Sequence, residues 1–207
     1  MILAKYSRVE RRKASIKMKI INASLEVFTE FGYVKTTVDD ITTRADIGHG
    51  TFYKYFKNKQ DLLSFLADDL IEIMVEYHPK HKELSVYERI KDRIQVVMDF
   101  YVNHRNILLV LNEAMIVDRQ FEEKWIKIHE TLNKYAERNL KASADKGYCR
   151  NVDMDMAIIA LFSMVEGYAH YTLKQPPGAM DINAIVDTMA DLCYHALFKV
   201  TDEVNCP

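Results

Sequence analysis

Apolar residues recur at helical spacing along nearly the whole chain, and glycine, proline and capping residues separate one stretch from the next. The first stretch begins at about Ser15, and Gly32 follows it where a left-handed residue would end a helix. Its apolar positions are Ile20, Ala23, Val27, Phe28 and Phe31. Residues 1–13 carry Lys and Arg with little apolar periodicity, so we expect a flexible basic arm there.

Two short helices are predicted next. Thr37, with Asp40 three residues later, fits the capping box of a helix that runs to about Ala45. The segment 46–50 holds two glycines, Gly48 and Gly50, within three residues, which indicates a tight turn and would allow another backbone to approach closely. After this turn, residues 51–56 have room for two helical turns.

The rest of the chain is predicted to be helical as well. Asn58 with Asp61 repeats the capping pattern and opens a helix that reaches about Tyr77. Further along the chain, helical spacing of apolar residues predicts a helix that stops near Gly147. The helix-breaking sequence Pro-Pro-Gly at 176–178 separates the last two predicted helices, which are the most apolar. Strand-like alternation is not seen, so the predicted fold class is all-α.

The charge of the chain is unevenly distributed. The first sixty residues hold twelve Lys and Arg against six Asp and Glu, whereas the remainder holds sixteen against twenty-four. A basic segment joined to an acidic remainder predicts that the first part meets a polyanion, although a solvated charged face would give the same pattern.

The lengths of the apolar runs and the spacing of the cysteines indicate in which cellular compartment the protein is located. The longest apolar run, Ala157 to Phe162, is far shorter than the roughly 20 residues of a membrane-spanning helix. The basic N-terminal residues lead into an amphipathic pattern and not into a signal peptide, so we expect a cytoplasmic protein. Cys149, Cys193 and Cys206 are odd in number and far apart, which is typical of reduced thiols.

Three helices within sixty residues, the second and third short and joined by a tight turn, match the helix-turn-helix that places its later helix in the major groove of DNA. The residues in order are Phe31-Gly32-Tyr33, Thr36-Thr37-Val38, Asp40-Ile41, Ala45, Ile47, Gly50-Thr51-Phe52-Tyr53, Tyr55-Phe56, Lys59 and Leu62. This order resembles the N-terminal signature of the TetR family of transcription regulators. The resemblance covers about residues 16–65, and beyond residue 80 only the helix pattern is similar.

The resemblance implies roles in DNA binding. It implies that Thr37, Tyr53 and Lys59 contact phosphates and so fix the register on the duplex. The residues that face the bases would come from the third helix and its lead-in: His49, Gly50, Thr51, Lys54 and Tyr55. Thr51 could pack against a thymine methyl and Lys54 could donate to guanine, while Gly50 lets the backbone come close. A surface aromatic at Tyr53 and a solvated charge at Lys54 are the alternatives, and Phe52 and Phe56 are expected in the core.

The basic arm has two open interpretations. Arg8, Arg11, Arg12 and Lys13 could enter a minor groove or contact phosphates, or they could form an unbound basic terminus.

Two domains are predicted. Residues 1–60 would carry the arm and the helix-turn-helix, and residues 61–207 a larger helical domain for effector binding and dimerisation.

One helix-turn-helix buries too little surface for tight specific binding, so we expect a homodimer that spans two half-sites. The last two helices are apolar over more of their circumference than one core face needs, and the resemblance also implies that they form the dimer interface. Burial within one chain is the alternative.

The resemblance also implies a pocket for a small effector in the larger domain. Large, adaptable side chains suited to an apolar ligand are Tyr101, His104, Met115, Trp125, Phe162 and Tyr171, although such residues also fill cores. Glu113 interrupts an apolar run, and Glu166 lies four residues before His170 on an apolar helix. Either carboxylate could bind a cationic or hydrogen-bonding effector. Pairing of Glu166 with His170, or across the dimer interface, is the alternative.

The sequence carries none of the common catalytic motifs. The chain lacks a Walker motif, a dinucleotide fingerprint, G-x-S-x-G and paired Cys-x-x-Cys, and the pair His78 and His81 lacks cysteine partners nearby. We therefore expect no enzyme, no cofactor and no metal. The sequence predicts a homodimeric regulator, a repressor by resemblance, that leaves its operator DNA when a small effector binds. An architectural DNA-binding protein that tethers a protein partner without a ligand is the alternative.

Overall fold

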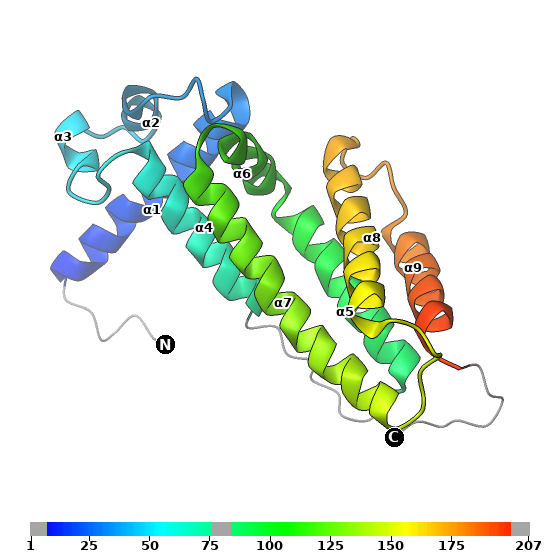
Figure 1. The fold of residues 1–207 in the computed structure, drawn as a ribbon. Helices are drawn as coiled ribbons and strands as arrows, with labels where there is room; N and C mark the ends of the chain where they lie inside the picture. Colours follow the sequence, from blue (N-terminus) through cyan, green and yellow to red (C-terminus); the bar gives the residue numbers. More distant parts are fainter. Residues whose placement is uncertain (1–7, 76–83, 200–207) are drawn as a thin grey trace. The chain divides into compact units, whose positions relative to one another are not determined.

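The computed structural model describes residues 8–75 and 84–199. Within these ranges the chain forms α-helices and no strand, so the predicted all-α fold is confirmed (Figure 1). The helices are α1 (Arg8–Phe31), α2 (Val38–Arg44), α3 (His49–Phe52), α4 (Lys59–Val75), α5 (Val86–Asn103), α6 (Arg105–Val117), α7 (Arg119–Asp145), α8 (Met154–Lys174) and α9 (Ile182–Leu197). The arm before Arg8, the pair His78 and His81, and Cys206 lie outside the described residues.

The chain divides into two compact units. The first unit combines Met1–Glu72 with Asn106–Glu122, and the second combines Ile73–Arg105 with Glu123–Pro207. The first unit therefore includes α1 to α3 together with most of α4 and α6. The domain boundary expected after residue 60 stays a prediction.

Local signals place several helix ends correctly. Gly32, with φ of 79°, follows α1, and Gly147, with φ of 77°, follows α7. The start of α1 differs from the expectation, because the helix begins at Arg8 and takes in residues 8–13 of the predicted flexible arm. Arg, Lys and Glu are good helix formers, so a nucleated helix can extend through them without an apolar stripe.

The core of the first unit is shared by α1, α2, the α3 region, α4 and α6. Phe52 and Phe56 are buried, as predicted. Other buried members include Ile20, Val27, Phe28, Ile41, Leu62 and Leu63, and α6 adds Leu108, Leu111 and Ala114. Full burial of a Leu or Phe side chain stabilises by roughly 1.5–3 kcal/mol, so α6 is an integral part of this unit.

The second unit is built around α5, which packs against α8 and α9. Met98 and Tyr101 of α5 are buried, and an ion pair joins Lys91 of α5 to Asp187 of α9. Cys149 and Cys193 are buried, and neither forms a disulfide within the described residues.

Helix α8 is unusually apolar. Among the described residues it is the helix that passes a test of length and composition for crossing a membrane, and only 22% of its apolar window is buried in the chain. A single helix of this kind is weak evidence for a membrane span. Its exposed apolar surface nevertheless needs an explanation.

Candidate nucleic-acid interface

The turn between α2 and α3 is tight and lies where the sequence indicated. Its left-handed residue is Asp46, with φ of 51°, and neither Gly48 nor Gly50 takes that conformation. The amide of Asp46 donates to Thr43 O at 3.2 Å, and the amide of Ile47 donates to Thr42 O at 3.1 Å. Asp tolerates left-handed backbone better than most residues because its short polar side chain can bond locally.

The N-terminus of α2 is held by the predicted capping box. The amide of Asp40 donates to Thr37 Oγ1 at 3.2 Å, and the amide of Thr37 donates to Asp40 Oδ2 at 2.8 Å. The Thr37 hydroxyl also donates to Asp40 Oδ2 at 2.6 Å. These bonds lower the pKa of the Asp40 carboxyl below its ordinary value, with the side-chain bond as the larger cause.

Helix α3 differs from the expectation in its bounds. It begins at His49, with Gly48 as its N-cap, and it ends at Phe52 instead of running from 51 to 56. The turn structure continues past the helix, since Tyr55 and Phe56 both donate to Phe52 O. Two buried aromatic side chains, Phe52 and Phe56, hold this segment on the core.

The side chains expected to face the bases lie together on and after α3. His49, Tyr53 and Lys54 are exposed, and Thr51 and Tyr55 are partly exposed. A Cβ built on Gly50 would meet no heavy atom within 4 Å apart from its chain neighbours and the backbone of its own helix, so the backbone at Gly50 is open. The predicted close approach of another backbone is therefore sterically possible here.

A small cluster links α2 to α3 at this surface. The His49 and Tyr53 rings contact edge to face with centroids 5.3 Å apart, and His49 Nδ1 lies 3.6 Å from Asp39 Oδ1. Asp39 was not among the predicted site residues. Its distance of ten positions from His49 in the sequence gives no local sign that the two side chains meet.

Lys59 has protein partners for its ammonium group. Its Nζ donates to Tyr33 O at 2.9 Å, Val34 O at 3.0 Å and Thr36 O at 2.7 Å. Burial lowers the pKa of this amine, and the Glu113 carboxylate opposes that shift. The Lys59 ammonium therefore binds the segment that leads into α2, and its predicted phosphate contact stays a prediction.

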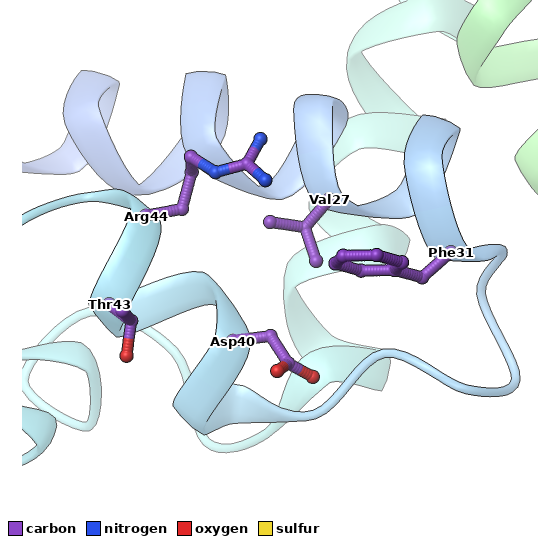
Figure 2. A pocket seen from close by; sticks show the side chains of 5 residues that line it. All are labelled: Val27, Phe31, Asp40, Thr43 and Arg44. Carbon is purple, nitrogen blue, oxygen red and sulfur yellow. The ribbon is translucent and has the colours of Figure 1, made fainter.

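Helix α2 is fixed to α1 by charge pairs. Arg44 lies 3.2 Å from Glu26 and 2.5 Å from Glu30 through its guanidinium nitrogens. Figure 2 shows the hollow beside these pairs, which α1 lines with Val27 and Phe31 and α2 lines with Asp40, Thr43 and Arg44. Both charged groups of this hollow already have partners, so it is a poor candidate for a ligand site.

The predicted effector residues are divided between the two units. Glu113 and Met115 lie in the first unit, and the other seven lie in the second. Glu113 accepts hydrogen bonds from the amides of Tyr33 and Val34, at 2.8 and 3.0 Å. No local feature of the sequence predicted this contact, which spans about eighty residues.

Four of the predicted effector residues gather in the second unit. The His170 ring meets Tyr101 at 5.3 Å and Trp125 at 6.1 Å, both edge to face, and His170 Nε2 lies 3.6 Å from Glu166 Oε1. The Tyr101 hydroxyl is buried and has no hydrogen-bond partner within the described part of the chain. Burial, assisted by the Glu166 charge, raises the pKa of the Tyr101 phenol well above its usual range.

The remaining predicted effector residues are less clearly grouped. The His104 ring lies beside the Phe100 ring, tilted by 47° with centroids 4.9 Å apart, and Phe162 is partly exposed. Tyr171 is half exposed and contacts Tyr168 on the same helix. Tyr171 therefore lies on the open face of α8.

Comparison with known proteins agrees with this geometry. The model of the bacterial regulatory proteins of the tetR family matches residues 20–64. The chain is 24% identical over 164 residues to the uncharacterized HTH-type transcriptional regulator YhgD of Bacillus subtilis, covering 78% of this chain and 86% of that protein. It is 24% identical to the probable acrEF/envCD operon repressor of Escherichia coli K12, covering 98% and 99% of the two chains.

A solved structure shares the fold. A putative TetR-family transcriptional regulator from Syntrophomonas wolfei superposes with a TM-score of 0.67 at 20% identity, covering 87% of this chain and 94% of that chain. The match of the family model to the helix-turn-helix and the similarity over most of the chain lead to one conclusion. The helix-turn-helix of this chain matches that of the TetR family of bacterial regulatory proteins, and a putative member of that family shares the fold of the chain.

Proposed function

We propose that this protein is a homodimeric repressor that binds operator DNA through α3 and releases it when a small molecule binds in the second unit. Repression is favoured by the name of the similar Escherichia coli protein, a probable operon repressor. The observation that carries DNA recognition is the exposed surface of α3, where polar side chains surround an open glycine backbone.

The proposed contacts follow from exposure. Tyr53 is 51% exposed and its hydroxyl would donate to a phosphate, as would the Thr37 hydroxyl if it turned from Asp40. Residues that would reach base edges are His49, Gly50, Thr51, Lys54 and Tyr55. Lys59 would act on phosphate only by giving up a carbonyl partner, so we assign it first to the support of α2.

The proposed dimer interface is the open face of α8 and α9, which lie side by side in Figure 1. Large apolar side chains exposed on this face are Met156, Ile159, Tyr168 and Tyr171 of α8 and Leu192 of α9. Gly167 is exposed among them, and a Cβ there would meet nothing within 4 Å, so a second helix could approach closely. Pairing with a second copy would cover an apolar helix that one chain leaves open.

The proposed effector site is the cluster of Tyr101, Trp125, Glu166 and His170. Aromatic faces favour a flat or apolar body, while the Tyr101 hydroxyl offers a donor and an acceptor without a partner among the described residues. Glu166 and His170 favour a ligand that also carries a hydrogen-bonding or cationic group. Glu113 is not part of this proposal, because its carboxylate binds the first unit.

The domain boundary after residue 60 and a cytoplasmic location of the protein are parts of the same proposal.

A rival function is architectural DNA binding that tethers a protein partner without a ligand. It predicts that binding does not depend on the DNA sequence. The two are separated by selecting duplexes from a random-sequence pool with the full chain. Enrichment of a two-fold symmetric sequence supports the repressor, and recovery of unrelated sequences overturns it.

The contacts are tested with the selected duplex and a scrambled duplex of equal length. Tyr53→Ala is expected to weaken binding to both, since a phosphate contact carries no sequence information, whereas Thr51→Ala is expected to reduce mainly the preference for the selected duplex. Equal behaviour of the two variants would contradict the assignment. Binding of wild-type protein should fall steeply with salt, because several phosphates are neutralised per half-site.

The effector proposal is tested by thermal shift against aromatic compounds with and without a cationic group. A ligand present at about a hundred times its dissociation constant stabilises by roughly 2.7 kcal/mol. A compound that raises the unfolding temperature should also release the selected duplex. A stabilising compound that leaves DNA binding unchanged would contradict release.

A further inference from the structure

The segment that joins α1 to α2 is bonded to the protein through nearly all of its peptide groups. Gly32 donates its amide to Phe28 O at 2.9 Å, and its own carbonyl accepts from Thr36, at 3.3 Å from the amide and 2.7 Å from the hydroxyl. The carbonyls of residues 33, 34 and 36 accept from the Lys59 ammonium. The shape of this segment fixes where α2 begins.

The remaining donors of the segment point to a residue far along the chain. Glu113 of α6 receives the amide of Tyr33 on Oε2 at 2.8 Å and the amide of Val34 on Oε1 at 3.0 Å. Two bonds to one carboxylate are charge-assisted and fix both the distance and the orientation of the peptide groups. Glu113 therefore accepts hydrogen bonds from two backbone amides of this segment, and Lys59 donates hydrogen bonds to three of its carbonyls.

Gly32 gives independent support. Its φ of 79° already favours glycine, and a Cβ at this position would lie 2.8 Å from Glu113 Oε2. The Glu113 carboxylate is thus packed so closely against the backbone that a side chain at residue 32 would have to displace the carboxylate. Tyr33 adds a second fixed point, because its ring is buried between Phe28 and Phe121, at centroid distances of 5.6 and 6.0 Å.

We propose that Glu113 is a positioning residue for DNA binding: from α6 it fixes the segment 32–36, and through this segment it sets the N-terminus of α2 and the surface presented by α3. Glu113 contacts no DNA in this proposal. The proposal rests on the DNA-binding role of the first unit and not on repression or on an effector.

The test compares Glu113→Gln with Glu122→Gln in the full-length chain. Both changes remove one negative charge from the first unit, and Glu122 is an exposed residue in the first turn of α7. Charge alone would strengthen binding to a polyanion equally in both variants. Positioning predicts that only Glu113→Gln weakens binding, because a Gln side chain has one acceptor oxygen for two amides.

The readout is the ratio of affinities for the duplex selected by the wild-type chain and for a scrambled duplex of equal length. A merely unstable protein would lose active molecules for both duplexes alike, so the ratio would stay constant. We expect the ratio to fall about tenfold in Glu113→Gln, equivalent to about 1.4 kcal/mol, and to stay unchanged in Glu122→Gln. Equal ratios in the two variants would overturn the proposal.

A second variant and a second measurement guard against loss of folding. Glu113→Asp keeps the charge but is one methylene shorter, so it too should lower the ratio. In each folded variant, amide hydrogen exchange at Tyr33 and Val34 should become faster than in the wild-type chain. Unchanged exchange at these two amides, or an unchanged ratio in Glu113→Asp, would contradict the proposed role.

Discussion

The buried hydroxyl of Tyr101 provides a sharp test of the second unit. Tyr101 is 1% exposed, and its hydroxyl has no partner among the residues that the structure describes. A buried polar group without a hydrogen bond destabilises a protein by about 1–3 kcal/mol. Tyr101→Phe removes this group and little else, so the variant should be more stable than the wild-type chain.

The expected gain is about 1 kcal/mol once the lost packing of one oxygen atom is allowed for, and this corresponds to a rise of roughly 2–4 °C in the unfolding temperature of a chain of this size. Equilibrium urea unfolding followed by far-UV circular dichroism measures it, at one protein concentration for all variants. Tyr33→Phe is the matched control in the first unit, because its hydroxyl is also buried and without a partner among the described residues. Tyr53→Phe, at a 51% exposed position outside the proposed dimer interface, should leave the free energy of unfolding unchanged.

The outcome that refutes this reasoning is a loss of stability in Tyr101→Phe, which would mean that the hydroxyl donates a native hydrogen bond. If the effector proposal is also correct, the gain reverses in the presence of a compound that stabilises the wild-type protein. Tyr101→Phe then loses part of the ligand-induced shift, whereas Tyr33→Phe keeps all of it.

Three further predictions concern the first unit. Thr37→Ala removes the capping box of α2 and should lower the free energy of unfolding by about 1 kcal/mol in urea titrations; an unchanged midpoint would contradict the role of the cap. Gly32→Ala should destabilise more than Gly147→Ala, although both glycines have φ near 78°, because only the Cβ at residue 32 meets a carboxylate; equal losses would mean that Glu113 moves aside freely. Burial raises the pKa of Tyr33 to about 12 from 10.0, so its contribution to stability is complete below pH 10 and is lost as the pH rises towards 12. Tyr33→Phe should therefore flatten the decline of stability above pH 10, and an unaltered decline would assign it to other groups.

Features set by neighbouring residues were predictable from the sequence. The end of α1 at Gly32, the capping box of Thr37 and Asp40, and the end of α7 before Gly147 all depend on residues a few positions apart. The dense signature of the helix-turn-helix also depends on such local spacing. Short-range chemistry therefore identified the fold class and the DNA-binding region.

Features set by distant residues were not predictable. Glu113 was grouped with possible effector residues because it interrupts an apolar run, yet its partners are the amides of Tyr33 and Val34. Lys59 was expected at a phosphate because of its place in the family signature, yet its ammonium has carbonyl partners in the protein. Helical periodicity shows which face is apolar, but it does not show which distant segment that face meets.

The composition of the first unit has a consequence for the order of folding during synthesis. The helix-turn-helix is complete in sequence by residue 64, but the unit to which it belongs also needs residues 106–122. Until α6 emerges from the ribosome, the core of the first unit lacks Leu108, Leu111 and Ala114. The amides of Tyr33 and Val34 likewise lack the Glu113 carboxylate that accepts their hydrogen bonds. The helix-turn-helix is synthesised first, but its unit can complete folding only after α5 of the other unit and then α6 have been synthesised. DNA binding is therefore delayed until much of the protein has been made.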